Sequence, residues 1–348
     1  MANHETRCRP SSKANIDVPF IKNDTRIMRN PVNLESRSPI VFDEASRDDA
    51  LQLIQLALVE DLGSVEKAEQ LDATTESIVP ANVSGEARFV SRESGIVCGM
   101  AVVGLVITNM QRGLTLEIKR QDGEPVEPGE TIAILSGNAQ DILIAERTCL
   151  NFLGRLSGIS TMTRAFVQRT HGTPAEVLDT RKTTPGWRRL EKYAVHCGGG
   201  ANHRMGLYDA VLIKDNHLAM MDILNDEPMD EIRTAIEDAR SWIHKNATRL
   251  THGTETVVQI EVDRLDQFEK ALSFAPDIIL LDNMSNEQLC QAVSIRDQQN
   301  KEVLLEASGG VNLDTISGIA QTGVDRISVG ALTHSSMNLD IGLDWKIG

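Results

Sequence analysis

Basic side chains gather in one short segment of this chain, from Leu178 to His217. Each follows an apolar run or lies beside glycines, where loops carry function, rather than along a helix face where charge would only be solvated. Because the whole chain has a net charge of −15, this local gathering indicates a pocket for a polyanion. The side chains are Arg181, Lys182, His203, Arg204 and Lys214.

The two arginines of this set suit recognition of a planar acid. A guanidinium group can bind a carboxylate or a phosphate through two parallel hydrogen bonds, whereas lysine and histidine add point charge and single hydrogen bonds. Three further cations, Arg188, Arg189 and Lys192, lie on the helix expected between the two loops. We interpret these three as partners in surface salt bridges.

Two carboxylates, Glu261 and Asp282, end apolar runs further along the chain. Facing one cavity, they could hold Mg²⁺ through few protein ligands and leave coordination positions for substrate phosphates. Either could instead pair with Lys214, which is the commoner fate of an isolated acid. Because cations and glycine loops are predicted near both acids, we favour a role in binding a metal ion and a sugar.

Two glycine-bearing loops follow the last two apolar runs and precede helical segments. Backbone N–H groups at such places can hold a phosphate. Simple turn glycines explain each loop about equally well, and the shared position of the two loops favours the phosphate. The residues are Ser308, Gly309, Gly310, Gly330 and Ala331.

The elements that must position these groups alternate between strand and helix. Short apolar runs recur at 175–178, 210–213, 257–260, 277–281, 303–305 and 326–329. Helical segments are predicted at 231–244, 265–274, 287–296 and 313–321. The alternation predicts a parallel α/β sheet or barrel, with the polar groups at the carboxyl ends of its strands, where barrels build active sites. The pattern alone does not separate a closed barrel from an open sheet.

The residues before this alternation follow another pattern. The segment 48–62 predicts an amphipathic helix that ends at Gly63. Strands are predicted at 87–97, 114–120 and 131–135, in a mostly antiparallel sheet. A further helix, from 138 to about 158, is expected to bridge the two units.

The composition is that of an ordinary soluble enzyme, with 348 residues of which 41% are hydrophobic. No stretch approaches the roughly 18 apolar residues of a membrane span. The net charge of −15 argues against a general nucleic-acid binder. The five cysteines form no CxxC pair, so neither a zinc site nor a disulfide framework is predicted, and a cytoplasmic location fits best.

A resemblance to a known family rests on these same segments. Residues 180–217, TRKTTPGWRRLEKYAVHCGGGANHRMGLYDAVLIKDNH, closely resemble the signature of the quinolinate phosphoribosyltransferase family. Further motifs stand in that family's order, namely ERTCLN, SGIST, IEVD, LLDN, LEASGG and SVGALTHS. The resemblance covers about residues 51–344.

The resemblance implies two α/β domains. An N-terminal α/β sandwich would span 44–155, and an incomplete parallel barrel of about six strands would span 156–334. Residues 1–43 are expected to form a disordered tail, and 335–348 to pack back on the sandwich. The family also implies a homodimer or an assembly of dimers, in which Arg147 of the ERTCLN motif reaches the neighbouring subunit's site; an ion pair between domains is the alternative.

The family's site residues carry over position by position. The pyridine-dicarboxylate pocket would be lined by Arg147, Arg181, Lys182, His203, Arg204 and Lys214. Phosphoribosyl pyrophosphate would be bound by Lys214, Glu261, Asp282, Ser308, Gly309, Gly310, Gly330 and Ala331. The substrate-binding set is completed by Thr180, Val329 and His334. The catalytic residues would be Lys214, Glu261 and Asp282, with the two carboxylates near the ribose and Mg²⁺, directly or through substrate or water.

The implied reaction transfers the phosphoribosyl group of phosphoribosyl pyrophosphate to quinolinate, with decarboxylation. Its products are nicotinate mononucleotide, pyrophosphate and CO₂, in the de novo biosynthesis of NAD. Mg²⁺ with phosphoribosyl pyrophosphate is the expected cofactor, and no organic cofactor is required. Neither nucleic acid nor a membrane is an expected partner.

Three alternatives remain at this point. One is a pyrophosphorylase of the same fold that acts on another base. Another is a Schiff-base aldolase built on Lys182 or Lys214, which would need a desolvated lysine. The third is a binding module for a phosphorylated metabolite, which carboxylates at both Glu261 and Asp282 argue against.

Two segments depart from the family pattern. The residues 72–75, Asp-Ala-Thr-Thr, stand where the family usually has a Gly-Asp-x-Thr-Thr element. The segment 221–255 is longer than in compact members, and we expect a surface insertion there rather than new chemistry.

Overall fold

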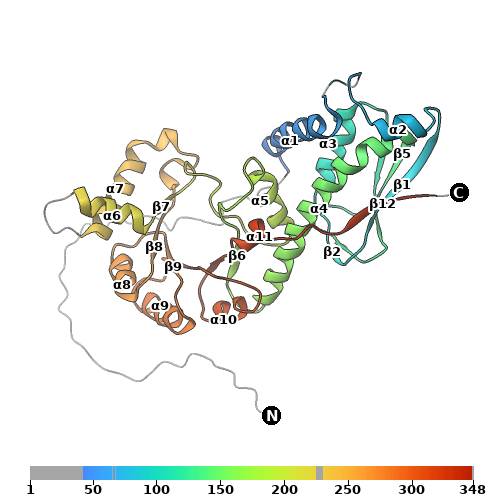
Figure 1. The fold of residues 1–348 in the computed structure, drawn as a ribbon. Coiled ribbons are helices and arrows are strands. Elements are labelled where there is room, and N and C mark those ends of the chain that lie inside the picture. Colours follow the sequence, from blue (N-terminus) through green and yellow to red (C-terminus); the bar gives the residue numbers. More distant parts are fainter. Residues whose placement is uncertain (1–41, 65, 67, 225–229, 347–348) are drawn as a thin grey trace, which may run out of the picture.

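The computed structural model describes residues 42–346, except 65, 67 and 225–229. Figure 1 shows two units, a small antiparallel sheet with its helices and a larger parallel sheet, joined along the helix α4 (Ala139–Arg169). The tail predicted at 1–43 therefore lies almost entirely outside the described residues. Within the described part of the chain, no helix is long and apolar enough to cross a membrane.

The smaller unit is built on an antiparallel sheet with the strand order β12-β1-β5-β3. Its strands are β1 (Ser84–Ser91), β3 (Thr115–Ile118), β5 (Thr131–Asn138) and β12 (Ile341–Trp345). A separate two-stranded sheet pairs β2 (Gly95–Ile96) with β4 (Pro125–Val126). The helices are α1 (Glu44–Leu62), α2 (Ala73–Ile78) and α3 (Met100–Met110). The antiparallel sheet predicted from the alternating pattern is thus confirmed.

Capping residues explain where α1 begins and ends. The side chain of Asp43 accepts a hydrogen bond from Ser46 N at 2.8 Å, and Gly63 closes the helix with φ 80°. The predicted helix at 48–62 is therefore confirmed, although it begins earlier. By contrast, α3 was not predicted, because its sequence is apolar on nearly all sides and lacks a helical period.

The bridging helix α4 is longer than the segment 138–158 predicted for it. It has 31 residues, and hence a length of about 46 Å. Buried hydroxyl groups allow it to continue, because Ser160 Oγ donates to Ala194 O at 2.7 Å and Thr163 Oγ1 donates to Ile159 O at 2.8 Å. These polar residues interrupt the apolar stripe in the sequence without ending the helix.

The larger sheet has six parallel strands in the order β6-β11-β10-β9-β8-β7. They are β6 (Glu176–Leu178), β7 (Val211–Ile213), β8 (Val258–Val262), β9 (Ile278–Asp282), β10 (Leu304–Ser308) and β11 (Arg326–Ser328). All six predicted apolar runs are therefore strands. In the described structure the edge strands β6 and β7 do not pair with each other, so the barrel is incomplete, as predicted.

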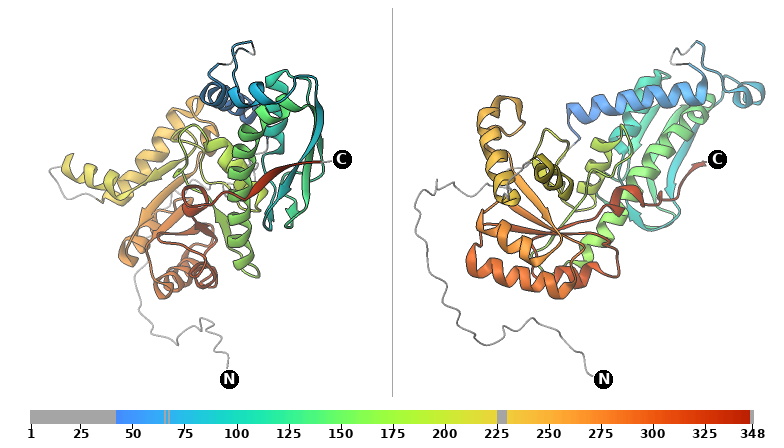
Figure 2. Two further views of the ribbon diagram at one scale, coloured as in Figure 1. Left: turned by 45° about the vertical axis from the view of Figure 1, so that its right-hand side comes forward. Right: turned by 60° about the vertical axis from the view of Figure 1, so that its left-hand side comes forward.

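Helices surround this sheet, and Figures 1 and 2 show that one of them, α6, projects beyond it. They are α5 (Arg188–Cys197), α6 (Asp215–Leu224), α7 (Glu231–Lys245), α8 (Leu265–Ser273), α9 (Asn286–Gln299), α10 (Ile316–Ala320) and α11 (Ala331–His334). The helix predicted at 231–244, within the expected insertion, is α7. Two 3₁₀ turns, Ala247–Arg249 and Gly253–Glu255, follow it and lead into β8.

After α11 the chain returns to the smaller sheet, where Ile341 of β12 lies opposite Ser91 of β1 (Figure 1). On the way it passes very close to α4. A Cβ atom on Gly158 would lie 1.9 Å from Met337 O, so no side chain fits there. The glycine of the SGIST motif therefore has a packing role.

Candidate active site

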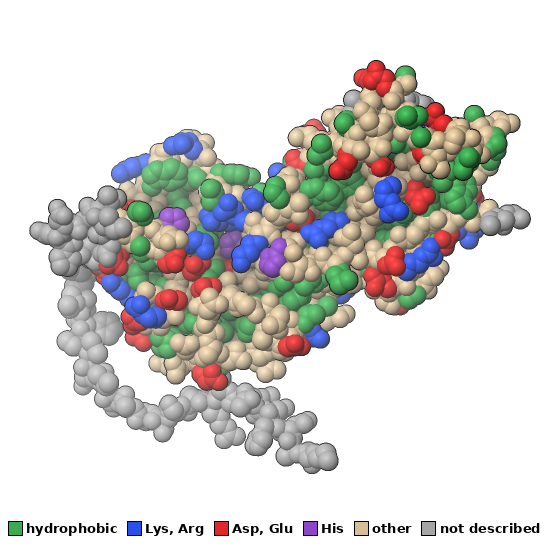
Figure 3. All heavy atoms as spheres, viewed as in Figure 1, with side chains coloured by type: hydrophobic (Ala, Val, Ile, Leu, Met, Phe, Trp, Pro, Cys, Tyr) green, Lys and Arg blue, Asp and Glu red, His purple; other side chains and the backbone are tan. Residues whose placement is uncertain are grey.

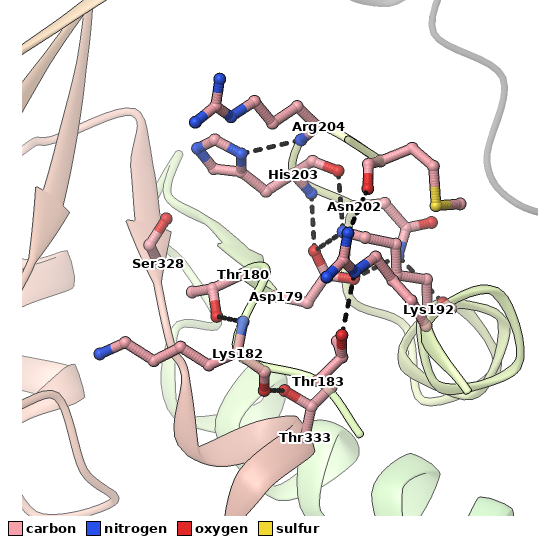
Figure 4. A network of polar contacts seen from close by, with 12 residues as sticks. Asp179, Thr180, Lys182, Thr183, Lys192, Asn202, His203, Arg204, Ser328 and Thr333 are labelled. Atoms are coloured by element: carbon pink, nitrogen blue, oxygen red, sulfur yellow. Dashed lines mark hydrogen bonds and ion pairs between the residues drawn. The ribbon is translucent and has the colours of Figure 1, made fainter. Parts of the chain in front are cut away.

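A completely buried ion pair holds the loop that follows β6. Asp179 and Lys192 of α5 are both 0% exposed, and Lys192 Nζ lies 2.5 Å from Asp179 Oδ1. The same carboxylate accepts hydrogen bonds from His203 N at 2.8 Å and Asn202 Nδ2 at 2.9 Å. This network, shown in Figure 4, fixes the loop that carries His203 against the end of β6.

The surface role predicted for Lys192 is therefore wrong. Of the other two cations on α5, Arg189 forms the expected partly exposed ion pair with Asp49, at 3.2 Å. Arg188 instead donates to Thr183 Oγ1 and Met205 O, so it holds loops rather than a carboxylate.

Arg204 is buried beside another arginine. It is 7% exposed, its Nη1 donates to Ala210 O at 2.8 Å, and its Nε has no hydrogen-bond partner in the described structure. Burial lowers the pKa of Arg204, and the positive charge of Arg181 lowers it further. The Nε of Arg181 is likewise buried without a partner among the described atoms. The two guanidinium groups repel each other, and an anion bound to both would relieve that repulsion.

The ends of β6 and β11 bring Lys182, Gly330 and His334 together. A Cβ on Gly330 would lie 3.1 Å from both Lys182 Cδ and His334 Nε2, so the position has little room for a side chain. An open hollow of about 640 Å³ is lined by Arg155, Lys182, Thr183, Thr184, Pro185, Thr333 and His334. Thr333 Oγ1 donates to Lys182 O at 2.7 Å and so fixes one wall of the hollow.

We call Arg181, Lys182 and Arg204 the cation cluster. Among the described residues, none of the three has a carboxylate oxygen within 4.0 Å of its charged nitrogens. In Figure 4 the side chains of Lys182, His203 and Arg204 extend toward the same side. Figure 3 shows basic side chains and histidines gathered in the middle of this face of the molecule. Such unbalanced positive charge suits an anionic ligand.

The predicted carboxylates lie at the carboxyl ends of neighbouring strands. Lys214, the residue after β7, lies with its Nζ 2.6 Å from Glu261 Oε2 of β8. Asp282 ends β9, is in register with Ser308 of β10, and accepts a hydrogen bond from Asn283 Nδ2 at 2.7 Å. The ion pair with Lys214, foreseen as an alternative for either acid, is therefore formed by Glu261.

The glycine loop after β10 packs on the loop after β9. Asn283 N donates to Ser308 O at 2.9 Å, and a Cβ on Gly309 would lie 2.2 Å from Asn283 Oδ1. Gly309 and Gly310 have φ 96° and 58°, which glycine adopts most easily. Turn geometry thus accounts for both glycines, and their phosphate-binding role stays a prediction.

Three further predicted residues lie at the same edge of the sheet. Thr180 Oγ1 accepts a hydrogen bond from Lys182 N at 3.0 Å. Val329 is buried, and its N–H donates to Leu178 O at 2.8 Å, which joins β11 to β6. Ala331 begins α11.

Arg147 lies apart from the other predicted residues. It is exposed on α4, and in the described structure no hydrogen bond or ion pair joins it to any of them. Arg155, about 12 Å farther along the same helix, does reach the hollow and donates to Glu191 Oε1 at 2.7 Å. A single copy of the chain therefore does not bring Arg147 to the cation cluster.

Glu306, a completely buried acid inside β10, was not among the predicted site residues. It accepts hydrogen bonds from Arg326 Nε at 3.1 Å and from Ser328 Oγ, and its Oε1 lies 3.3 Å from His203 Nε2. Burial alone would raise the pKa of Glu306, but His203 and Arg326 lower it to about 2, so the group is a carboxylate. The signal in the sequence was a lone acid within an apolar strand of the LEASGG motif.

Family models for the N-terminal and C-terminal domains of quinolinate phosphoribosyl transferase match residues 72–157 and 159–344. The chain belongs to the quinolinate phosphoribosyltransferase family. The carboxylating nicotinate-nucleotide pyrophosphorylase of Mycobacterium leprae is 40% identical over 306 residues, which cover 87% of this chain and 100% of that protein. The decarboxylating quinolinate phosphoribosyltransferase 1b of Nicotiana tabacum is 37% identical over 301 residues, or 85% and 82% of the two chains.

Solved structures of nicotinate-nucleotide pyrophosphorylases share the fold of this chain. The nicotinate-nucleotide pyrophosphorylase of Francisella tularensis superimposes with a TM-score of 0.74 at 36% identity, covering 86% of this chain and 96% of the other. That of Ehrlichia chaffeensis gives a TM-score of 0.73 at 39% identity, with 85% and 98% covered. The family and the fold class predicted from the sequence are therefore confirmed.

Proposed function

We propose that this protein transfers the phosphoribosyl group of phosphoribosyl pyrophosphate to quinolinate and releases pyrophosphate and CO₂. The product is nicotinate mononucleotide, for NAD biosynthesis. The cation cluster is the observation that carries the proposal, because its basic groups lack carboxylate partners in the described structure of a chain whose net charge is −15. Membership of the quinolinate phosphoribosyltransferase family supports the same reaction.

The cation cluster would bind the acid. Quinolinate has two carboxylates and the sugar donor has several phosphate charges, so the two reactants repel each other unless cations stand between them. Arg181 and Arg204 repel each other before the acid binds. Bidentate hydrogen bonds to its carboxylates would replace that repulsion by attraction.

The carboxylates at the ends of β8 and β9 would act on the sugar. The lone pair of the pyridine nitrogen forms a bond to the anomeric carbon, while the bond from that carbon to pyrophosphate breaks and its electrons leave with the oxygen. Positive charge develops on the ribose ring, and Glu261 and Asp282 are the groups that would stabilise it. Lys214, 2.6 Å from Glu261, would oppose the negative charge of the leaving pyrophosphate.

Glu261 and Asp282 are also the residues that would hold Mg²⁺, because carboxylate oxygens are its preferred protein ligands. Each carboxylate uses one oxygen in the contacts described above and has a second oxygen to offer. No group of three or more His, Cys, Asp or Glu side chains in the described part of the chain is arranged as a metal site. Bound at the two carboxylates, Mg²⁺ would neutralise charge on the phosphates.

Decarboxylation follows from the charge of the alkylated ring. Once the ring nitrogen is cationic, the bond between the adjacent ring carbon and its carboxylate can break. The electron pair then stays on the ring carbon beside N⁺, CO₂ leaves, and a proton from water completes the product. The contribution of the cation cluster is to hold the acid in place throughout both steps.

We further propose a homodimer in which Arg147 completes the site of the neighbouring subunit. Its exposure on α4, away from the cation cluster of its own chain, supports this arrangement. The division into a sandwich at 44–155 and a barrel at 156–334 stays a proposal. A cytoplasmic location is proposed as well; no disulfide joins the four cysteines of the described residues.

A carbon-release assay tests the reaction. Quinolinate labelled in its 2-carboxylate, supplied with phosphoribosyl pyrophosphate and Mg²⁺, should release labelled CO₂ in step with pyrophosphate and nicotinate mononucleotide. Omission of any component, or chelation of Mg²⁺ with EDTA, should stop the release. Nicotinate, which lacks the second carboxylate, is the matched control and should turn over far more slowly.

Two outcomes would count against the proposal. If nicotinate reacts as well as quinolinate, the protein is a pyrophosphorylase for another base. If borohydride traps a carbonyl substrate on Lys182 or Lys214, detected as a mass increase of the protein, the aldolase alternative is correct.

A further inference from the structure

His203 makes four polar contacts, and together they account for every hydrogen-bonding group that it has. Its N–H donates to Asp179 Oδ1 at 2.8 Å, and its carbonyl oxygen accepts from Lys192 Nζ at 2.9 Å. In the ring, Nδ1 accepts from Arg204 N at 2.8 Å, and Nε2 lies 3.3 Å from Glu306 Oε1. Neither ring nitrogen is therefore left over for a substrate.

These contacts determine where the proton of the ring must be. A backbone N–H can only donate, so the nitrogen that faces Arg204 N, which is Nδ1, carries no proton. The ring proton is consequently on Nε2, which faces the carboxylate of Glu306. The backbone donor at Nδ1 and the carboxylate at Nε2 therefore favour the same tautomer.

Glu306 is itself held firmly. It is completely buried inside β10, and Arg326 Nε and Ser328 Oγ, both from β11, donate to its two oxygens. Arg326, the charged donor of the two, keeps the carboxylate ionised and prevents it from turning away from His203. The barrel interior thus presents one fixed acceptor to the imidazole ring.

We propose that Glu306 is a positioning residue for quinolinate binding, which holds the ring of His203 and, through Nδ1 of that ring, the backbone of Arg204. The inference rests on the proposed function and deepens it. The guanidinium of Arg204 can meet a carboxylate only if its backbone is fixed, since its own side chain has one described hydrogen bond, to Ala210 O. His203 would therefore affect quinolinate binding indirectly, by fixing the backbone of Arg204.

Kinetics of Glu306→Gln test this role, with Ser328→Ala as the matched control. Glu306→Gln removes the negative charge that orients Nε2–H, so the KM for quinolinate should rise about tenfold, the effect of one charge-assisted hydrogen bond. The KM for phosphoribosyl pyrophosphate should change less than about twofold. Ser328→Ala removes a neighbouring hydrogen bond but keeps the carboxylate, and should leave the KM for quinolinate near that of the unaltered enzyme.

A double-mutant cycle separates positioning from general damage to the barrel. In an enzyme that already carries His203→Asn, the further change Glu306→Gln should raise the KM for quinolinate very little, because the ring that it positions is gone. Equal increases in both backgrounds would overturn the proposal. If Glu306→Gln fails to fold because Arg326 loses its partner, Glu306→Gln combined with Arg326→Met keeps the barrel interior uncharged and permits the same cycle.

Nitrogen NMR of labelled histidine gives a test that needs no substrate. In the unaltered protein, Nε2 of His203 should be protonated and Nδ1 should not, and Glu306→Gln should shift both signals toward a mixture of tautomers. A protonated Nδ1 in the unaltered protein would refute the inference. If the unaltered enzyme fails to turn over quinolinate while His203 has the expected tautomer, the proposed function is at fault rather than the contact with Glu306.

Discussion

Two groups of charged side chains lie close together in this molecule and differ in their partners. Inside, Asp179 pairs with Lys192 and Glu306 pairs with Arg326, in contacts of 2.5 and 3.1 Å. The cation cluster, although Arg204 is also buried, has no carboxylate within 4.0 Å among the described residues. A charge that is buried with its partner fixes the position of loops. A charged group without a partner in the protein can form its ion pair with a bound ligand.

The difference also changes what a substitution does. Removing one member of a buried pair leaves the other charge in a medium of low polarity, which destabilises the fold. Removing a member of the cation cluster relieves repulsion and should leave the fold intact. Stability and activity should therefore respond to different sets of residues. The three experiments below are given in order of decreasing expected effect.

The largest effect is expected for Lys192→Met. Asp179 would be left as an uncompensated buried charge, so the free energy of unfolding should fall by about 3–5 kcal/mol. Denaturant unfolding followed by circular dichroism measures this change. The control, Lys270→Met, breaks a 3.0 Å ion pair with Asp230 whose side chains are 42% and 36% exposed, and should cost about 1 kcal/mol or less. Equal losses in the two variants would remove the distinction between the buried pair and an exposed one.

Arg204→Ala should damage activity instead of stability. Loss of one buried guanidinium from the acid pocket should lower kcat/KM for quinolinate by about 100-fold. The melting temperature should stay the same or rise slightly, because the repulsion from Arg181 is gone. Steady-state kinetics and thermal unfolding measure the two quantities, with Arg189→Ala, from the exposed pair with Asp49, as the control. Near-normal affinity for quinolinate in Arg204→Ala would exclude Arg204 from the site.

A smaller, statistical effect is expected when two inactive variants are mixed. Arg147→Ala and Lys214→Ala each disable every site of their own dimers. After subunit exchange, one site of each mixed dimer regains both residues, so activity should recover to about a quarter of that of the unaltered enzyme. Assays after mild unfolding and refolding of the mixture measure this recovery. If exchanged dimers, identified by native mass spectrometry, stay inactive, Arg147 does not act across the subunit boundary.

Most of the barrel could be predicted from the sequence because its strands are simple. Runs such as 278–281 are buried on both faces and are therefore continuously apolar, and polar residues mark their ends. The helix α3 could not be predicted in this way, because it is an apolar run without a helical period. The end of α4 could not be predicted either. Ser160 donates to a carbonyl oxygen of α5, and the local sequence pattern does not reveal this contact.

In the candidate site, some residues could be predicted from the sequence and others could not. Arg181 and Lys182 could be recognised because their type and their place after a strand both indicate an anion pocket. Lys192 and Glu306 could not, because a buried charge is explained only by its partner, and these partners lie 13 and 20 residues away in the chain. Residues that bind a ligand can be recognised from their type and their place in the sequence. Residues that position them can be recognised only from the tertiary structure.

The pairing of β12 with β1 has a consequence for the order in which the molecule forms. On the ribosome, β1 emerges early and can pair at once with β5, but its other edge stays open until the whole barrel has been synthesised. Contacts between residues so distant in sequence form slowly. The small sheet, which comes first in translation, is therefore among the last parts of the molecule to be completed.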